Sequence, residues 1–213
     1  MNERGAPLPA PSISSAVAGI LSAALALGLG ELAAGVSNRF ESFVVAVADV
    51  IVDKAPGGVV RVSIESLGAT QKTVLLVGVT IGTLGIGAMV GLVARRNQIT
   101  AVALFLAFGS FGAWVVSRSP QTSTDLSWLV ACVAATVGAI TLLRAPPRVV
   151  QLDHGLENPR NTYADRRQFL GWATGMSLAA GAMTGIGRVV LADNSVSKAR
   201  DQIVLPDPAR IGP

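Results

Sequence analysis

Two charged residues adjoin long uncharged stretches of this 213-residue sequence, and they are the first candidates for chemistry. Glu31 follows the uncharged stretch 5–30, and Arg188 follows the uncharged stretch 168–187. A charge at membrane depth costs about 2.5–3.5 kcal/mol or more, so such residues usually pair or serve a function. Three roles remain open. In the first, the two residues form an ion pair that fastens the first apolar segment to the last. In the second, Glu31 relays protons towards a quinone-like site. In the third, each side chain reaches the interface separately.

The other residue types that commonly catalyse reactions or bind metals are scarce. Cys132 is the only cysteine, so the chain has neither an intrachain disulfide nor a cysteine metal site, and we expect a small apolar core residue there. His154 is the only histidine, which leaves no pair of histidines to ligate a haem. The sequence contains no glycine-rich phosphate loop, no nucleophile elbow and no zinc-ligand spacing. It therefore predicts no catalytic residues, metal ligands or cofactor-binding residues within this chain.

A pair of arginines precedes the last apolar stretch. Arg166 and Arg167 are followed by Gln168, Phe169 and Leu170 and then by a Gly/Ala-rich segment. This order is typical of a twin-arginine export signal, and it predicts the twin-arginine translocation machinery as a partner. The alternative is that the two arginines merely carry the positive charge that flanks membrane spans on their cytoplasmic side.

The composition predicts the elements that must position these residues. Hydrophobic residues make up 51% of the chain and charged residues only 14%, against about 25% charged in soluble domains. Five stretches of 18 to 26 residues contain no Asp, Glu, Lys or Arg, and about 20 apolar residues suffice to cross a bilayer. An ordinary globular domain, a disordered tail and a collagen-like rod are excluded. We predict an all-α membrane bundle in the lipid bilayer, with five transmembrane helices at 12–36, 73–93, 99–116, 126–143 and 169–191.

A shorter apolar segment, residues 40–52, lies between the first two predicted spans. Around a helix, Glu41, Ser42, Asp49 and Asp53 fall within a sector of about 120°. Thirteen residues are too few to cross a bilayer, so we predict an interfacial helix that ends before the Pro-Gly-Gly sequence at 56–58. It serves either as a docking shelf for an external domain or as a seal over the bundle.

The positive charge is concentrated at the ends of the apolar stretches. A net charge of +4 and a pI near 10 therefore do not indicate nucleic-acid binding. Clusters of arginine mark cytoplasmic loops, and Arg95-Arg96 and the 144–168 segment carry such clusters. We predict a cytoplasmic N-terminal tail at 1–11, a basic cytoplasmic loop at 144–168 and an extracytoplasmic linker at 192–213. The N-terminus is then inside and the C-terminus outside.

Two further patterns concern packing. Glycine pairs at the four-residue spacing that permits close helix contact occur at 78/82, 87/91, 171/175 and 181/185. Trp114, Trp128 and Trp172 lie near span ends, where we expect them to anchor the bundle at the interface.

Five short segments form a recognisable pattern along the chain: Gly-Glu-Leu-Ala-Ala at 30–34, the segments 47–56 and 64–72, Asp-Arg-Arg-Gln-Phe-Leu at 165–170 and Val-Leu-Pro-Asp-Pro at 204–208. Together they resemble the N-terminal membrane region of bacterial molybdopterin-dependent oxidoreductases of the sulfite oxidase-like type, and the resemblance covers nearly the whole chain.

The resemblance implies a membrane anchor in a bacterial cytoplasmic membrane. In that family a helical membrane region precedes an extracytoplasmic catalytic domain that binds a molybdenum cofactor. The catalytic cysteine and the pterin-binding residues would lie beyond Pro213, so the chain itself is expected to be non-catalytic. It would then be a fragment, a truncated reading frame or a separate subunit. The alternatives are a subunit that passes electrons between an external oxidoreductase and quinone, and a free-standing small membrane protein or transporter.

Overall fold

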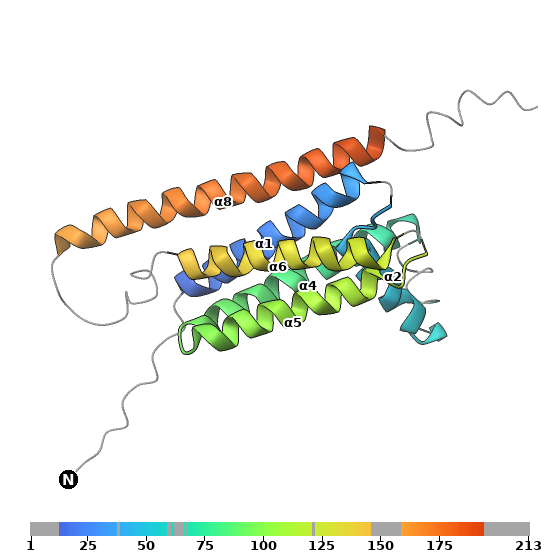
Figure 1. Ribbon diagram of the computed structural model, residues 1–213, viewed down its shortest axis with the longest axis horizontal. Helices are drawn as coiled ribbons and strands as arrows, with labels where there is room; N and C mark the ends of the chain where they lie inside the picture. Colours follow the sequence, from blue (N-terminus) through green and yellow to red (C-terminus); the bar gives the residue numbers. More distant parts are fainter. Residues whose placement is uncertain are drawn as a thin grey trace, which may run out of the picture.

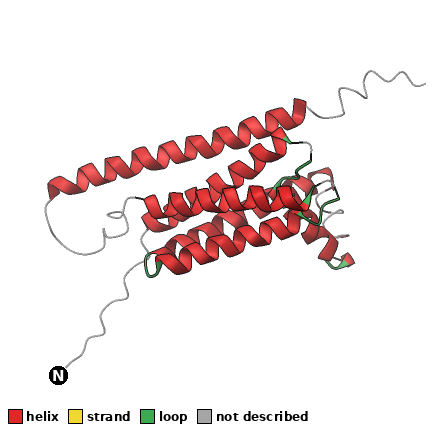
Figure 2. Cartoon of the chain, viewed as in Figure 1, coloured by secondary structure: helices red, strands yellow, loops and turns green. Residues whose placement is uncertain are grey.

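A computed structural model describes residues 13–37, 39–58, 61, 66, 68–120, 122–145 and 159–193 of the chain. Within these residues every regular element is helical (Figure 2). The elements are α1 (Ile13–Val36), α2 (Phe43–Lys54), a short 3-10 helix η1 (Gly68–Thr70), α4 (Gln71–Ala94), α5 (Gln98–Val116), α6 (Thr124–Arg144) and α8 (Pro159–Asp193).

Five of these helices are long and apolar enough to cross a membrane: α1, α4, α5, α6 and the Arg167–Ala192 part of α8. The predicted all-α bundle of five spans with one short additional helix is therefore confirmed, and the chain is a multi-pass membrane protein. The observed ends of the first four spans differ from the predicted ends by at most two residues. Hydropathy predicts these ends well because charged or polar residues adjoin each stretch.

Helix α8 departs from the predicted boundary. It begins at Pro159, ten residues before the predicted span, so the segment 159–168, predicted as part of the connection between spans, is helical. Hydropathy marks where a helix enters the hydrocarbon, but a helix can continue through polar sequence beyond it. Proline is favoured in the first turn of a helix, where its missing N–H would have no partner. With 35 residues, α8 is about 52 Å long, well beyond the roughly 30 Å hydrocarbon core.

Helix α1 is the centre of the bundle (Figure 1). It packs against α4 and α6, which run antiparallel to it, and against α8, which runs parallel to it. Helices α5 and α6 pack against each other and complete the bundle. The start of α1 and the end of α8 consequently lie at opposite ends of the bundle, as expected for an odd number of spans.

Close contact between α1 and α4 depends on glycine. A Cβ atom at Gly91 would lie 2.2 Å from the carbonyl oxygen of Ser15, and one at Gly19 would lie 2.1 Å from that of Gly87. Any side chain at these positions would push the two helices apart. Of the four glycine pairs that the sequence contains, 87/91 is used in this way. A Cβ at either member of the other three pairs would meet nothing within 4 Å.

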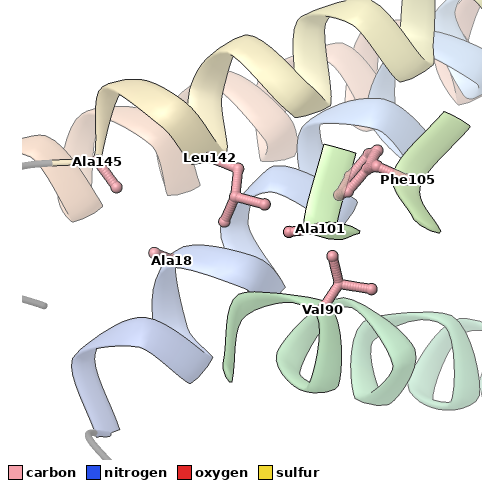
Figure 3. Packing of buried hydrophobic residues seen from close by; sticks show 6 residues of the cluster. All are labelled: Ala18, Val90, Ala101, Phe105, Leu142 and Ala145. Carbon is pink, nitrogen blue, oxygen red and sulfur yellow. The ribbon is translucent and has the colours of Figure 1, made fainter. Parts of the chain in front are cut away.

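A core cluster of buried residues closes the bundle at the end where α1 begins. It joins α1, α4, α5 and α6 through small side chains around one phenyl ring, with the members Ala18, Val90, Ala101, Phe105, Leu142 and Ala145 (Figure 3). Trp172 of α8 packs against this cluster and is partly buried. It therefore contributes to the protein interior as well as lying near a span end.

The short helix α2 lies across the opposite end of the bundle, where α1 ends. It packs against α5, α4 and α1, and its buried residues are Val44, Ala46 and Ala48. Asp49 and Asp53 are exposed. An amphipathic helix at the end of a bundle agrees with the predicted element at 40–52, although the observed helix begins three residues later because Ser42 caps it.

Candidate functional site

The best-defined polar site surrounds Glu31, near the end of α1. This carboxylate is 7% exposed and is the one buried acidic residue in the part of the chain that the structure describes. Burying an ionised carboxylate is costly unless it gains hydrogen bonds and an opposite charge. Both of its oxygens have such partners. The Ser42 hydroxyl donates to Oε1, and Nε of Arg188 lies 3.6 Å from Oε2.

Ser42 connects this carboxylate to the start of α2. It is the N-cap residue of that helix, and its Oγ accepts a hydrogen bond of 3.2 Å from the backbone N–H of Val44. The hydroxyl therefore accepts from the helix and donates to Glu31. The positive end of the α2 dipole also lies near the carboxylate.

Arg188 reaches the site because α1 and α8 meet without side chains between them. A Cβ at Gly187 would lie 2.3 Å from the carbonyl oxygen of Glu31, and one at Gly35 would lie 2.3 Å from that of Gly187. Because Gly187 precedes Arg188 directly, this contact places the Arg188 backbone close to α1. The arginine side chain itself remains 61% exposed, so it can also reach lipid headgroups.

The site therefore unites three segments that are distant in sequence: the end of α1, the start of α2 and the end of α8. An ion pair between Glu31 and Arg188 is one of the roles that the sequence left open, and the structure places the two side chains together. The sequence did not identify Ser42 as a partner of Glu31. A serine just before an apolar helical run is a recognisable N-cap signal, but its second hydrogen bond depends on tertiary packing.

A second polar contact fixes α2 to the connection between α5 and α6. The Ser119 hydroxyl donates to Oε2 of Glu41, and the Glu41 N–H donates to Oγ1 of Thr122 at 3.0 Å. Nearby, the guanidinium of Arg118 lies 3.9 Å from the ring centroid of Trp114, a cation–π contact. These contacts fasten the start of α2 at two points, so α2 is an integral part of the bundle end.

The twin-arginine residues lie within α8, at the end of the bundle where α1 begins. The Arg167 side chain is exposed, Leu170 is 63% exposed, and Phe169 stacks on Trp172 with a centroid distance of 6.1 Å. Arg166 belongs to the same helix, but its side chain lies outside the described residues.

Cys132 does not lie where we expected it. Its side chain is exposed on the surface of α6 and is not a core residue. His154 lies outside the described residues, so nothing tests the role of that side chain. Trp114 and Trp128 are exposed near helix ends, as interfacial anchors require.

The described residues contain no group of three or more His, Cys, Asp or Glu side chains that could hold a metal ion. The Glu31 site has one carboxylate, one hydroxyl and one guanidinium. This chemistry suits a structural ion pair between helices. No family model, curated protein or solved structure matches the chain.

Proposed function

We propose that this chain is the membrane anchor of an oxidoreductase domain of the molybdopterin-dependent, sulfite oxidase-like type. In this proposal the domain stands on the outer face of a bacterial cytoplasmic membrane, connected through residues 192–213. The bundle holds the domain and takes part in its export, and it performs no reaction by itself.

The attachment of α8 to α1 is the observation that carries the proposal. The chain continues from the last helix of an anchor to the domain that it holds. Any force on this segment must be transmitted through the last helix to the rest of the bundle. The Gly35–Gly187 contact and the Glu31–Arg188 pair both lie at the end of α8 where the chain leaves it. Helix α8 is thus fixed where an external domain would pull on it.

The proposed orientation rests on how the basic residues cluster, because their number does not separate the two ends. Of the described basic residues, Arg95, Arg96, Arg144 and Arg167 lie at the end where α1 begins, and Arg39, Lys54, Arg61, Lys72, Arg118 and Arg188 lie at the opposite end. Described acidic side chains gather at the opposite end, around α2 and the start of α6. The adjacent pairs Arg95-Arg96 and Arg166-Arg167 both flank spans at the end where α1 begins. Since such clusters mark the cytoplasmic side of a span, we assign this end to the cytoplasm and the end of α8 to the outside.

The described residues do not fit a molybdenum cofactor. They contain no cluster of metal-ligating side chains, and the single cysteine lies on the exposed surface of α6. The proposal therefore assigns the cofactor and the redox chemistry to the external domain.

A proton-relaying role for Glu31 beside a quinone is the second candidate, and the geometry does not favour it. Both carboxylate oxygens already have partners, Ser42 and Arg188. In the Glu31→Gln variant, the anchor proposal expects unchanged quinone-linked turnover by the exported enzyme. Loss of that turnover with normal export would favour electron transfer through the bundle.

Two experiments test the anchor proposal. The first reads the coding DNA after the Pro213 codon in all frames and in the neighbouring gene. A sulfite oxidase-like domain there supports the proposal, and its absence would contradict it.

In the second experiment, a fluorescent protein is fused to the chain after Pro213. The fluorescent protein is one that becomes fluorescent only if it folds before it is exported. We expect fluorescence outside the cytoplasm that depends on the twin-arginine machinery. The double variant Arg166→Lys/Arg167→Lys keeps the positive charge and should abolish this export. Equal export by both forms would mean that the arginines act only as flanking charge.

A further inference from the structure

A cavity in the described part of the chain lies among α1, α2, α4, α5 and α6. Its volume is about 550 Å³, within the range of sites that bind small molecules. Thr83 is the only polar side chain that lines it, and the Thr83 hydroxyl is already bonded to the carbonyl of Val79 at 2.9 Å. Its described lining therefore offers an occupant packing contacts and no free side-chain hydrogen-bond donor.

Absent side chains create this cavity. Gly78 and Gly82 face it from successive turns of α4, and a Cβ built at either position meets nothing within 4 Å. Gly109 and Gly112 line it from α5, and Ala131, Ala134 and Ala135 line it from α6. Along α4, the 87/91 pair thus brings α4 close to α1, whereas the 78/82 pair leaves space for the cavity.

The cavity is a groove that opens towards the bilayer between α4 and α5. The lining residues Val74, Ile86, Phe108 and Phe111 are each between 37% and 49% exposed. The deep end is closed by Phe105, which lines the groove and belongs to the core cluster shown in Figure 3. The other end is covered by Phe43, Val47 and Ile51 of α2.

The length of the groove identifies its occupant. From Val74 to Ile86 the lining of α4 extends about 18 Å, at 1.5 Å per residue. One leaflet contributes about 15 Å of hydrocarbon, half of the 30 Å core. Because α2 lies at the bundle end with exposed carboxylates, the groove runs from headgroup level to about the middle of the bilayer. This is the depth that one lipid chain occupies.

We propose that the groove binds one acyl chain of a glycerophospholipid from the leaflet beside α2. Within a membrane, association depends on packing contacts more than on the hydrophobic effect. The phenyl rings of Phe43, Phe105, Phe108 and Phe111 provide such contacts on one side, and the glycines of α4 leave room on the other. The proposal is independent of the anchor function and of any external domain.

Native mass spectrometry of the full chain in a mild detergent tests the proposal. The protein is purified from membranes, freed of excess lipid, and then exposed to vesicles of palmitoyl-oleoyl phosphatidylglycerol. We expect one glycerophospholipid per chain to remain on the wild type. In Gly82→Leu, a side chain fills the groove, and the retained fraction should fall about tenfold, to the detection limit.

Gly175→Leu is the matched control. Gly175 also has open space around its Cβ position, but it lies on α8, away from the groove, and this variant should retain lipid as the wild type does. Equal retention by all three proteins, equal loss in both variants, or an isoprenoid lipid as the retained molecule would overturn the proposal.

A spin-labelled phosphatidylglycerol provides a measurement that does not depend on how the variants fold. Wild-type protein in vesicles should give a strongly immobilised component of about one lipid per chain, with the label near the end of the acyl chain. A spectrum in which every lipid near the protein is equally mobile would overturn the proposal.

Discussion

The carboxylate of Glu31 and the guanidinium of Arg188 lie 3.6 Å apart, and this contact joins the first membrane-spanning helix to the last. The two partners differ in environment. Glu31 is buried, whereas Arg188 is 61% exposed. Removing one partner should therefore have a different effect from removing the other.

We expect Arg188→Met to lower the free energy of unfolding by roughly 2 kcal/mol. The substitution leaves a buried carboxylate without a cation, and the loss falls below the 3–5 kcal/mol of fully buried pairs because Arg188 is largely exposed. Glu31→Gln should cost less than 1 kcal/mol, since Gln still accepts from Ser42 and the freed arginine can reach lipid headgroups. Thermal unfolding in detergent measures both. Equal losses in the two variants would contradict the asymmetry.

Ser42→Ala should loosen the start of α2. It removes the N-cap and the hydrogen bond to Glu31, and loss of a cap alone costs about 1 kcal/mol. Hydrogen exchange should accelerate at the first amides of α2, from Phe43 onward. The control is Ser123→Ala, because Ser123 is the N-cap residue of α6 but its side chain makes no capping hydrogen bond. Unchanged exchange rates at α2 in Ser42→Ala, or faster exchange at α6 in the control, would show that the capping hydrogen bond is unimportant.

Gly187→Ala should weaken the contact between α1 and α8. The added methyl group would lie 2.3 Å from the carbonyl oxygen of Glu31, and overpacking of this kind costs about 1–3 kcal/mol. Gly185→Ala adds the same group two residues away, where nothing lies within 4 Å, and it should be neutral or stabilising. The difference in melting temperature between the two variants measures the effect. Identical temperatures would mean that the helices separate without cost.

Cys132 should report the lipid phase. Its side chain is exposed midway along α6, so a spin label attached there should collide readily with oxygen, which is concentrated in hydrocarbon. The same label should be protected from a water-soluble nickel chelate. As the only cysteine in the chain, it requires no prior substitution. Strong relaxation by the nickel chelate would place Cys132 in a water-filled space instead.

The sequence predicted the number of spans and most of their ends because charge and apolarity change abruptly there. It could not predict which side of each helix faces inward. In a soluble helix a polar stripe marks the exposed face, but lipid and protein interior are both apolar. Cys132 illustrates the difficulty: nothing in its neighbouring residues distinguished a lipid-facing position from a core position.

The same limit applies to glycine. Four pairs had identical spacing, yet one packs against α1, a second lines the groove, and two lie in open space along α8. Gly35 and Gly187, which form the tightest contact between α1 and α8, belong to none of these pairs. A charged pair was easier to foresee, because an ionised group at membrane depth needs a partner and few candidates were present.

The central position of α1 also constrains how the protein is made. Glu31 is synthesised 157 residues before Arg188. At ribosomal rates of roughly 5–20 residues per second, its final cation is delayed by on the order of ten seconds. Ser42 follows only 11 residues later and can hydrogen-bond the carboxylate during this interval. Until α8 is inserted, the face of α1 that packs against it has no protein partner. A membrane chaperone or lipid must cover that face during this time. The length of the chain between Glu31 and Arg188 determines how long this lasts.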